Sequence, residues 1–421
     1  MTSTIRKLRF ALVALSFMHA GLAGARADEE SINYDVAIVP AYVLPDPLVM
    51  QDGRPVTTAA MWRDERRPEI LALFQAQVYG RSLPKPQHVR FRVIENQPIV
   101  HGLATRKRIG VELVGLAGAY RVLTVTLLVP RQAIGPVPAF VGMHLFDPRS
   151  DDPRPGKPLE GVPNENLPGD RLLEVILQRG YAIATLEAKD FCPDDKQAFR
   201  DGALHHYFPD RAGVPGPEEP GAIATWAWGL SRALDYLETD RDVDAHHVAV
   251  IGHSRMGKTA LWAGAQDERF ALVISNDSGC GGASLARRRY GETVAHITRV
   301  FPHWFCGNYV KYSERLDDLP VDQHELVALI VPRPVYVASA VEDRWADPRG
   351  EFLSAAGADG VYRLLEKPGL GATEPPEPGK SIGQFIGYHI RIGKHALTDY
   401  DWLRYLDFAD RHFGKRAKSG T

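Results

Sequence analysis

The stretch HVAVIGHSRMGK at residues 247–258 decides the fold. Its first half is a short apolar run, which is typical of a strand buried on both faces. Gly252 and Gly257 flank Ser254, and the lack of a Cβ at both positions lets the strand turn sharply into a helix. We predict that this turn holds the Ser254 hydroxyl at the edge of a sheet, where it can act as a nucleophile. In the alternative interpretation, Ser254 only caps the first turn of a helix.

The chain after residue 137 alternates between short apolar runs and stretches with helical spacing. The apolar runs lie at 138–143, 180–186, 248–252, 272–275 and 335–340. The helical stretches lie at 168–179, 221–239, 256–266, 323–329 and 399–413. Buried strands separated by crossover helices predict a mostly parallel sheet with helices on both faces. This three-layer α/β sandwich is the layout of the α/β-hydrolase fold, and Ser254 falls at its nucleophile turn.

The chain before residue 137 shows a different pattern. Helical spacing at 60–80 is followed by β-branched alternation at 89–94, 109–114 and 120–129. These segments predict antiparallel strands on the N-terminal side of the sheet, with a turn at 115–118. Two segments rich in proline and glycine, 147–170 and 368–380, are expected to be surface excursions near the carboxyl edge of the sheet.

Residues 1–27 are predicted to be a signal peptide. A basic start is followed by the apolar stretch 10–22 and by small residues at 25–27, which are typical of a cleavage site. Residues 28–421 would then form a single catalytic domain of the α/β-hydrolase type, secreted or periplasmic. A composition of 44% hydrophobic and 24% charged residues is ordinary for a globular enzyme.

Charge and hydropathy exclude two classes of partner. The chain has 50 basic and 52 acidic residues, and loss of the four basic residues within 1–27 would leave 46 basic residues and a net charge of −6. Nucleic acid is therefore not an expected partner. No apolar run after residue 27 reaches the length of a membrane span, so no membrane partner is expected. We expect a monomer.

The three cysteines, Cys192, Cys280 and Cys306, allow at most one intramolecular disulfide. In an oxidising compartment we favour a Cys280–Cys306 bridge. Three small buried thiols are the alternative.

Ser254 needs a general base, and His395 is the best candidate among the fifteen histidines. It lies just before the last amphipathic stretch, where the histidine of a serine, acid, histidine triad is found in this fold. His389 is the fallback.

The acid that orients the base should follow a strand at its carboxyl end. Asp343 follows the run 335–340 and is our first choice, while Asp277 follows the run 272–275 and is the second. Glu342 is a minor option. The aspartate that does not serve the base is expected to hydrogen-bond to its own turn.

The motifs together resemble one known family. The sequence GHSRMGK at 252–258 is similar to the G-x-S-R-x-G-K signature of the glucuronoyl esterases of carbohydrate esterase family 15. Further segments resemble the bacterial branch of that family in the same order, and they lie at 276–282, 291–293, 301–306, 342–348 and 393–395. The resemblance is dense over 240–405 and weak before 130.

The resemblance implies further site residues. Arg255 would stabilise the oxyanion, which is chemically apt because a fixed guanidinium favours a developing alkoxide over a neutral ester. Lys258, one helical turn after Ser254, would bind sugar hydroxyls. Glu292 and Trp345 would contact the hydroxyls and the face of a uronic acid. If the family resemblance is set aside, Arg255 is interpreted as a surface residue of a helix and Trp345 as a buried structural tryptophan.

One departure bears on the acid. Fungal members of the family carry a catalytic glutamate where Asp277 stands, and aspartate is one methylene shorter. Asp277 is therefore expected to fall short of His395, which is a second reason to favour Asp343. In the alternative interpretation, the two aspartates share the role of the acid.

The implied activity is hydrolysis of esters of (4-O-methyl-)glucuronic acid, as in the links between glucuronoxylan and lignin, through an acyl-enzyme. No cofactor or metal is expected, because no H-x-x-x-H or paired-cysteine ligand set is present. Alternatives are an acetyl-xylan or cephalosporin-type acetyl esterase, a secreted peptidase, and a non-catalytic carbohydrate-binding protein. Two cations beside the nucleophile argue against an acetyl pocket.

Overall fold

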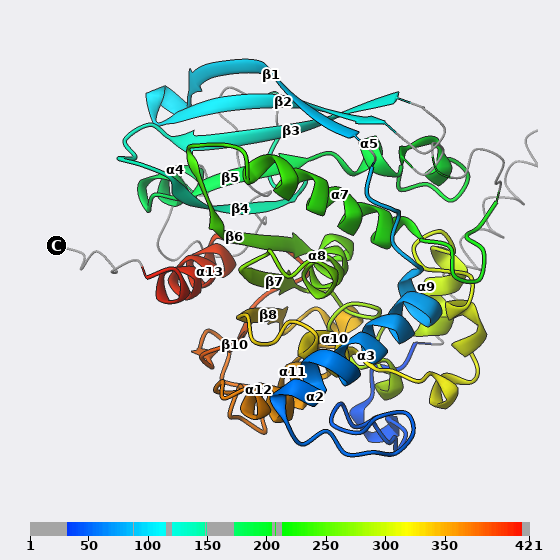
Figure 1. Ribbon diagram of the computed structural model, residues 1–421. Coiled ribbons are helices and arrows are strands. Elements are labelled where there is room, and N and C mark those ends of the chain that lie inside the picture. Colours follow the sequence, from blue (N-terminus) through cyan, green and yellow to red (C-terminus); the bar gives the residue numbers. More distant parts are fainter. Residues whose placement is uncertain are drawn as a thin grey trace, which may run out of the picture.

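The structure is a computed structural model that describes residues 32–86, 88–114, 120–147, 149, 172–203, 207 and 213–414. The predicted signal peptide, the turn at 115–118 and most of the predicted excursion at 147–170 lie outside these residues. The described chain forms a mixed sheet with helices on both faces (Figure 1).

The described ranges contribute ten strands to this sheet, in the order β1-β2-β3-β5-β4-β6-β7-β8-β10-β9. Their bounds are β1 (His88–Ile99), β2 (Ala104–Val114), β3 (Tyr120–Pro130), β4 (Val137–Met143), β5 (Ala182–Leu186), β6 (Val243–His253), β7 (Leu272–Asn276), β8 (Val335–Ala340), β9 (Ser381–Ile382) and β10 (Ile386–Arg391). Strands β5, β4, β6, β7, β8 and β10 are parallel neighbours. Strands β1 to β3 are antiparallel, as is the pairing of β3 with β5. The predicted α/β-hydrolase layout is confirmed, including the antiparallel strands on its N-terminal side.

The α-helices are α2 (Ala59–Met61), α3 (Arg67–Phe74), α4 (Leu172–Gln178), α5 (Ala188–Phe191), α7 (Ala222–Leu237), α8 (Arg255–Gln266), α9 (Val294–Val300), α10 (Gln323–Ala328), α11 (Pro348–Gly357), α12 (Asp359–Leu364) and α13 (Asp399–His412). The predicted helical segment at 60–80 includes two π-helical turns, η2 (Trp62–Arg66) and η3 (Gln75–Tyr79). Short 3-10 turns are η1 (Val36–Ile38), η4 (Val100–Gly102), η5 (Phe199–Asp201), η6 (Ala286–Arg288), η7 (Tyr309–Tyr312), η8 (Leu316–Asp318) and η9 (Arg344–Ala346).

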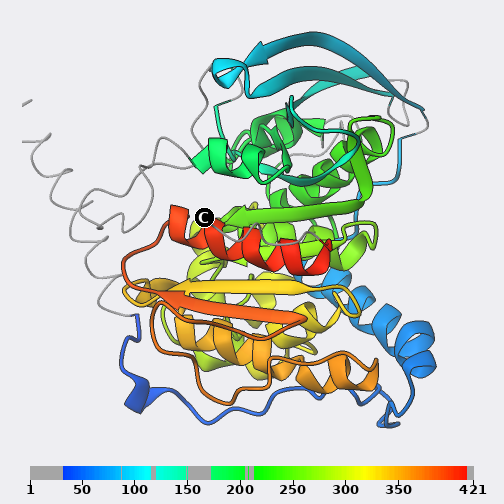
Figure 2. The ribbon, with the colours of Figure 1, turned by 90° about the vertical axis from the view of Figure 1, so that its left-hand side faces the viewer.

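Two apolar cores lie on opposite faces of the sheet, because successive residues of a strand point to opposite sides. On β6, Val248 and Val250 belong to the core shared with α7 and α8. Ala249 and Ile251 belong to the core shared with α4 and α13. Figures 1 and 2 show α13 lying across the face of the sheet opposite to α7 and α8. Burial on both faces explains why the parallel strands are nearly continuous apolar runs.

Strand β10 was not predicted from the sequence. Its residues Gly387, His389 and Arg391 alternate with apolar ones, and a strand interrupted by glycine and charge gives a weak apolar signal. The structure buries His389 and Arg391 completely or nearly so. Their polar atoms have buried partners, described below, and this compensation makes their burial possible.

The favoured Cys280–Cys306 bridge is wrong. All three cysteines are free and buried, and burial raises the pKa of each thiol. They behave as small apolar residues, which is the alternative given above. Among the described residues, no helix is long and apolar enough to cross a membrane.

Candidate active site

The turn between β6 and α8 holds Ser254 in a strained conformation. Its φ of 57° and ψ of −128° lie outside the regions that a residue with a side chain prefers. A Cβ on Gly252 would lie 1.9 Å from the carbonyl oxygen of Met256, so only glycine fits there. The Ser254 N–H donates to the carbonyl of Asn276 at the end of β7 over 2.9 Å. The serine is half-buried, so solvent reaches part of it.

His395 lies beside this turn, on the loop between β10 and α13. Its ring centroid is 4.5 Å from that of His253, the residue before the serine. Its Nδ1 contacts Oδ2 of Asp343 over 2.6 Å. Asp343 is buried directly after β8, whereas the His395 side chain is 42% exposed. Since Nδ1 is occupied by the carboxylate, Nε2 is the ring nitrogen left for a proton transfer.

Asp277 also lies near the ring but is bonded elsewhere. Its Oδ2 accepts from Nη2 of Arg391 and from the N–H of Ala396, both over 3.2 Å. Its Oδ1 has no hydrogen-bond partner among the described residues. One ligand atom from each of Asp277, Asp343 and His395 lies within 4.8 Å of the other two. Burial, with the nearby carboxylates of Glu351 and Asp401, raises the pKa of Asp277 well above its ordinary value.

The two minor candidates lie outside this group. Glu342 is exposed, and its N–H bonds to the backbone of the loop that carries His395. His389 is fully buried on β10, between the Tyr336 hydroxyl at 3.0 Å and Asp401 at 2.9 Å. The described contacts connect neither residue to Ser254.

His253 packs beside His395 but does not take up a proton at neutral pH. Burial, reinforced by the neighbouring His395, lowers the pKa of His253 to about 4. Its Nδ1–H donates to Oδ1 of Asn276 over 2.7 Å, which fixes the ring. At neutral pH this imidazole is uncharged, so it places no positive charge beside the candidate base.

Arg255 begins α8 and is held by a residue that the sequence analysis did not identify. Its Nε lies 2.8 Å from Oδ2 of Asp194. The other oxygen of Asp194 accepts from His303 over 3.0 Å and from the Trp304 indole over 2.6 Å. Burial opposes charge on Asp194, but these hydrogen bonds and the Arg255 charge outweigh it and lower its pKa. Asp194 lies outside any helix or strand, so neither periodicity nor spacing in the sequence pointed to it.

Glu292 lies beside both Lys258 and Trp345. Lys258 is buried, donates to the carbonyl of Ser278, and lies 6.0 Å from the ring centroid of Trp304. Burial raises the pKa of Glu292, although Lys258 and a hydrogen bond from Trp345 act in the opposite direction. The Glu292 N–H donates to the Trp345 carbonyl over 2.9 Å. We call this group of a buried cation, a buried acid and a half-buried indole the polar wall.

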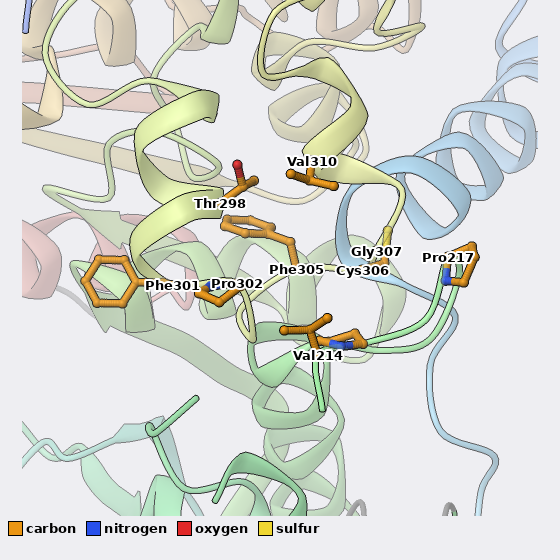
Figure 3. Close-up of a pocket in the computed structure, with 10 residues that line it drawn as sticks. Val214, Pro217, Thr298, Phe301, Pro302, Phe305, Cys306, Gly307 and Val310 are labelled. Atoms are coloured by element: carbon orange, nitrogen blue, oxygen red, sulfur yellow. The ribbon is translucent and has the colours of Figure 1, made fainter. Parts of the chain in front are cut away.

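An apolar pocket lies between α9 and the segment 214–217 (Figure 3). It encloses about 290 Å³ and is lined by Val214, Pro215, Pro217, Thr298, Phe301, Pro302, Phe305, Cys306, Gly307 and Val310. Phe301, which lines this pocket, stacks on Trp304 with ring centroids 3.9 Å apart, and neither Arg255 nor Asp194 is among the lining residues. Because its lining is apolar, the pocket is unsuited to a carboxylate.

The fold and this arrangement define an α/β-hydrolase whose strand-to-helix turn after β6 carries a serine followed by an arginine. A profile of fungal glucuronyl esterases matches residues 168–366. Carbohydrate esterase MZ0003, from an unknown prokaryotic organism, is 42% identical over 92% of this chain and 93% of its own length. A 4-O-methyl-glucuronoyl methylesterase of Wolfiporia cocos is 30% identical over 77% of this chain and 72% of its own.

Solved structures give the same result. The structure of a promiscuous CE15 esterase from the marine bacterial metagenome has a TM-score of 0.80 and 43% identity, and it covers 91% of this chain and 100% of that one. The chain belongs to carbohydrate esterase family 15, the glucuronoyl esterases. The predicted family and the predicted class of enzyme, a carboxylic ester hydrolase, are therefore confirmed.

Proposed function

We propose that this protein hydrolyses esters between the carboxyl group of a (4-O-methyl-)glucuronic acid and an alcohol, through an acyl-enzyme on Ser254. The proposal is supported most directly by one observation: an imidazole bonded to a buried carboxylate lies beside a serine held in a strained turn. Nucleophile, base and orienting acid are the three parts that such a reaction needs.

The steps follow from the positions of these groups. Ser254 Oγ attacks the ester carbonyl while Nε2 of His395 takes its proton. The resulting oxyanion is stabilised by the N–H of Arg255, which as the first residue of α8 has no acceptor within the helix, and by the Arg255 guanidinium. His395 then gives the proton to the departing alcohol. Water, deprotonated by the same ring, attacks the acyl-enzyme and releases the uronic acid and free Ser254.

The substrate class follows from the wall beside the nucleophile. Lys258 and Glu292 offer a buried cation and a buried acid to sugar hydroxyls, and Trp345 offers an indole to the C–H face of a pyranose. The curated relative from Wolfiporia cocos is a 4-O-methyl-glucuronoyl methylesterase by name. We propose further that the natural substrates are lignin–carbohydrate esters of glucuronoxylan. The enzyme would then be exported to act on them.

The first test is turnover of defined esters by the purified protein. We expect hydrolysis of benzyl and methyl D-glucuronate at a higher kcat/KM than release of acetate from acetylated xylan. In Lys258→Met, KM for benzyl glucuronate should rise about tenfold, because a charge-assisted contact is lost. The same variant should affect p-nitrophenyl acetate much less. Hydrolysis of acetylated xylan without hydrolysis of glucuronate esters would identify an acetyl esterase instead.

The second test assigns the acid. Asp343→Asn should lower kcat by about 10²- to 10⁴-fold, because the amide favours the wrong tautomer of His395. Asp277→Asn should lower kcat by less than about tenfold, because an amide oxygen still accepts from Arg391 and Ala396. Ser254→Ala serves as the inactive reference. A loss of turnover in Asp277→Asn with near-normal turnover in Asp343→Asn would reverse the two assignments.

A further inference from the structure

Arg391, the last residue of β10, lies under the loop that carries His395. Its side chain is 4% exposed. It donates to three carbonyl oxygens of this loop: that of Ile392 over 3.2 Å, that of Lys394 over 2.8 Å and that of Ala396 over 2.6 Å. The last two belong to the residues on either side of His395. The guanidinium therefore fixes the peptide groups that set the direction of the imidazole.

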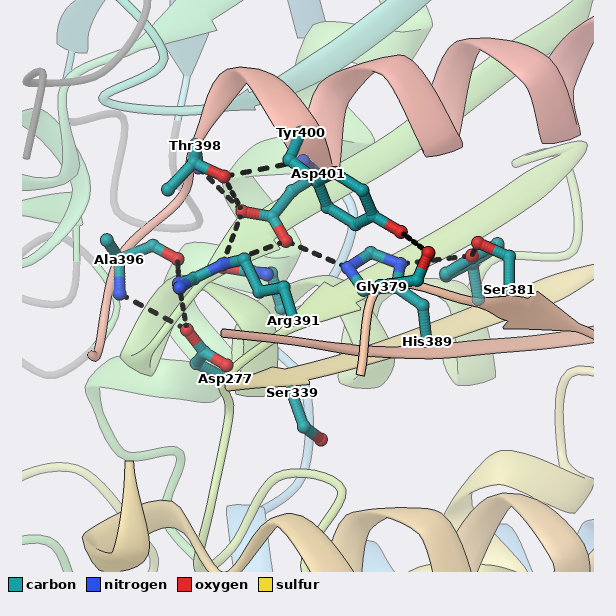
Figure 4. A network of polar contacts seen from close by, with 12 residues as sticks. Asp277, Ser339, Gly379, Ser381, His389, Arg391, Ala396, Thr398, Tyr400 and Asp401 are labelled. Carbon is teal, nitrogen blue, oxygen red and sulfur yellow. Dashed lines mark hydrogen bonds and ion pairs between the residues drawn. The ribbon is translucent and has the colours of Figure 1, made fainter. Parts of the chain in front are cut away.

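Two buried carboxylates hold the guanidinium in place (Figure 4). Its Nε lies 3.0 Å from Oδ2 of Asp401, and its Nη2 lies 3.2 Å from Oδ2 of Asp277. Asp401 also accepts from the N–H and the hydroxyl of Thr398, both over 2.7 Å, at the start of α13. The loop is thus tied down at 394, 396 and 398 by a single ionic network.

On the side facing β8, the Glu342 N–H donates to the carbonyl of Gly393 over 3.0 Å, two residues before His395. The side chains of Ile392, Lys394 and His395 are exposed, so apolar packing does not fix them. The contact between His395 and Asp343 restrains one ring nitrogen but not the backbone from which the ring extends. A base displaced by about 1 Å from the nucleophile loses roughly two orders of magnitude in rate.

We propose that Arg391 is a positioning residue for His395: it holds the loop carbonyls at 394 and 396 so that the imidazole faces Ser254. The inference rests on the proposed role of His395 as the base. It also gives Asp277 a function, because the aspartate that stands in place of the family's glutamate anchors this arginine and the N–H of Ala396.

Arg391→Lys tests the proposal, since lysine keeps the charge but has a single nitrogen and cannot bridge two carbonyls and two carboxylates. We expect kcat for benzyl glucuronate to fall roughly 10- to 100-fold, with KM within about twofold of the wild type. The downfield proton resonance of the hydrogen bond between His395 and Asp343 should weaken or move. If Arg391→Lys does not fold, Arg391→Gln gives the same comparison with one amide donor retained.

Arg287→Lys is the matched control. Arg287 is a buried arginine that also donates to three loop carbonyls, at 317, 319 and 321, and pairs with a buried aspartate, Asp322. The loop to which it donates, 317–321, carries none of the site residues. Its variant should lose a similar amount of thermal stability while keeping kcat within about twofold.

A double-variant cycle separates positioning from general support. In a His395→Ala background, Arg391→Lys should reduce the residual rate by less than twofold, because the group on which it acts is gone. An equal loss of rate in both backgrounds, or an unchanged kcat in Arg391→Lys, would overturn the proposal. Full activity of His395→Ala would instead contradict the proposed function itself.

Discussion

Arg255, next to Ser254, forms an ion pair with the carboxylate of Asp194. Its side chain is 44% exposed, so packing alone does not hold it, and Asp194 makes the ion pair that directs it. His303 and Trp304 hold Asp194 from the other side. A guanidinium contributes to an oxyanion site only if it is oriented before the charge develops.

Asp194→Asn should therefore lower kcat by about tenfold, with a smaller change in KM, because the guanidinium is no longer fixed when the oxyanion forms. Steady-state kinetics with benzyl glucuronate measure both constants. The neighbouring Asp195→Asn is the control, since Asp195 accepts from the N–H groups of Gln197 and Ala198 in its own turn. Equal losses in the two variants would show that Arg255 does not act through Asp194.

At the scale of elements, α11 supports the loop that follows β7. Glu351 on this helix is fully buried, and its Oε1 accepts from the N–H groups of Ser278 and Gly279 over 2.7 and 2.9 Å. Its Oε2 accepts from the Ser339 hydroxyl over 2.6 Å, at the end of β8. One carboxyl group thus ties two strand ends together behind the site.

This carboxyl group makes stability depend on pH. Burial raises the pKa of Glu351 to about 8, so the folded protein keeps its proton at pH values where the unfolded chain has lost it. The folded state then binds more protons than the unfolded state between the ordinary glutamate pKa and about 8. By linkage, the free energy of unfolding falls as pH rises through this window.

Glu351→Gln should remove this contribution, because glutamine mimics the protonated acid. The wild type should lose up to about 1.4 kcal/mol per pH unit relative to the variant between roughly pH 5 and pH 8. Urea unfolding at several pH values measures the difference. Glu374→Gln, which affects an exposed ion pair with Arg349, should show no such slope over this range. Parallel curves for wild type and Glu351→Gln would contradict the assignment.

At the scale of the whole molecule, residues near the start of the described chain contact the residues that precede Glu292 and Trp345. The Gly291 N–H donates to the carbonyl of Asn33 over 2.9 Å, beside Glu292. The Arg344 guanidinium lies 5.0 Å from the ring centroid of Tyr34 and donates to its carbonyl, beside Trp345. Residues more than 250 positions apart along the chain therefore fix the two segments that carry the candidate uronate contacts.

Tyr34→Ala should raise KM for benzyl glucuronate roughly two- to fivefold. This change corresponds to the loss of the cation–π contact between Tyr34 and Arg344, the residue before Trp345. The kcat value should stay within twofold, because neither Ser254 nor His395 touches this segment. Val43→Ala, an exposed residue of the same lead-in, should change neither constant. A loss in kcat at constant KM would show that the segment supports the catalytic group rather than the wall.

Local patterns were sufficient for much of the fold. The strand, turn and helix around Ser254 follow from a short apolar run and two glycines, and the structure shows that a Cβ on Gly252 would clash. The parallel strands other than β10 were predicted because burial on both faces leaves a continuous apolar signal. Helices α4, α7, α8, α10 and α13 were predicted from their helical spacing, whereas α5, α9, α11 and α12 were not. Strand β10 lacked this signal because polar residues interrupt its apolar run. These residues can be buried because they have partners on other elements, which the sequence of the strand does not reveal.

The sequence by itself determined the layers of the fold, the serine at the turn and the family, because these depend on neighbouring residues and on motif order. Only the tertiary structure decided which carboxylate touches His395, what holds Arg255, and that the cysteines stay apart. Asp343 and His395 are 52 positions apart, and Asp194 and Arg255 are 61 apart. Contacts of this kind are fixed by strand order and by the packing of loops at the sheet edge, and no local periodicity encodes them.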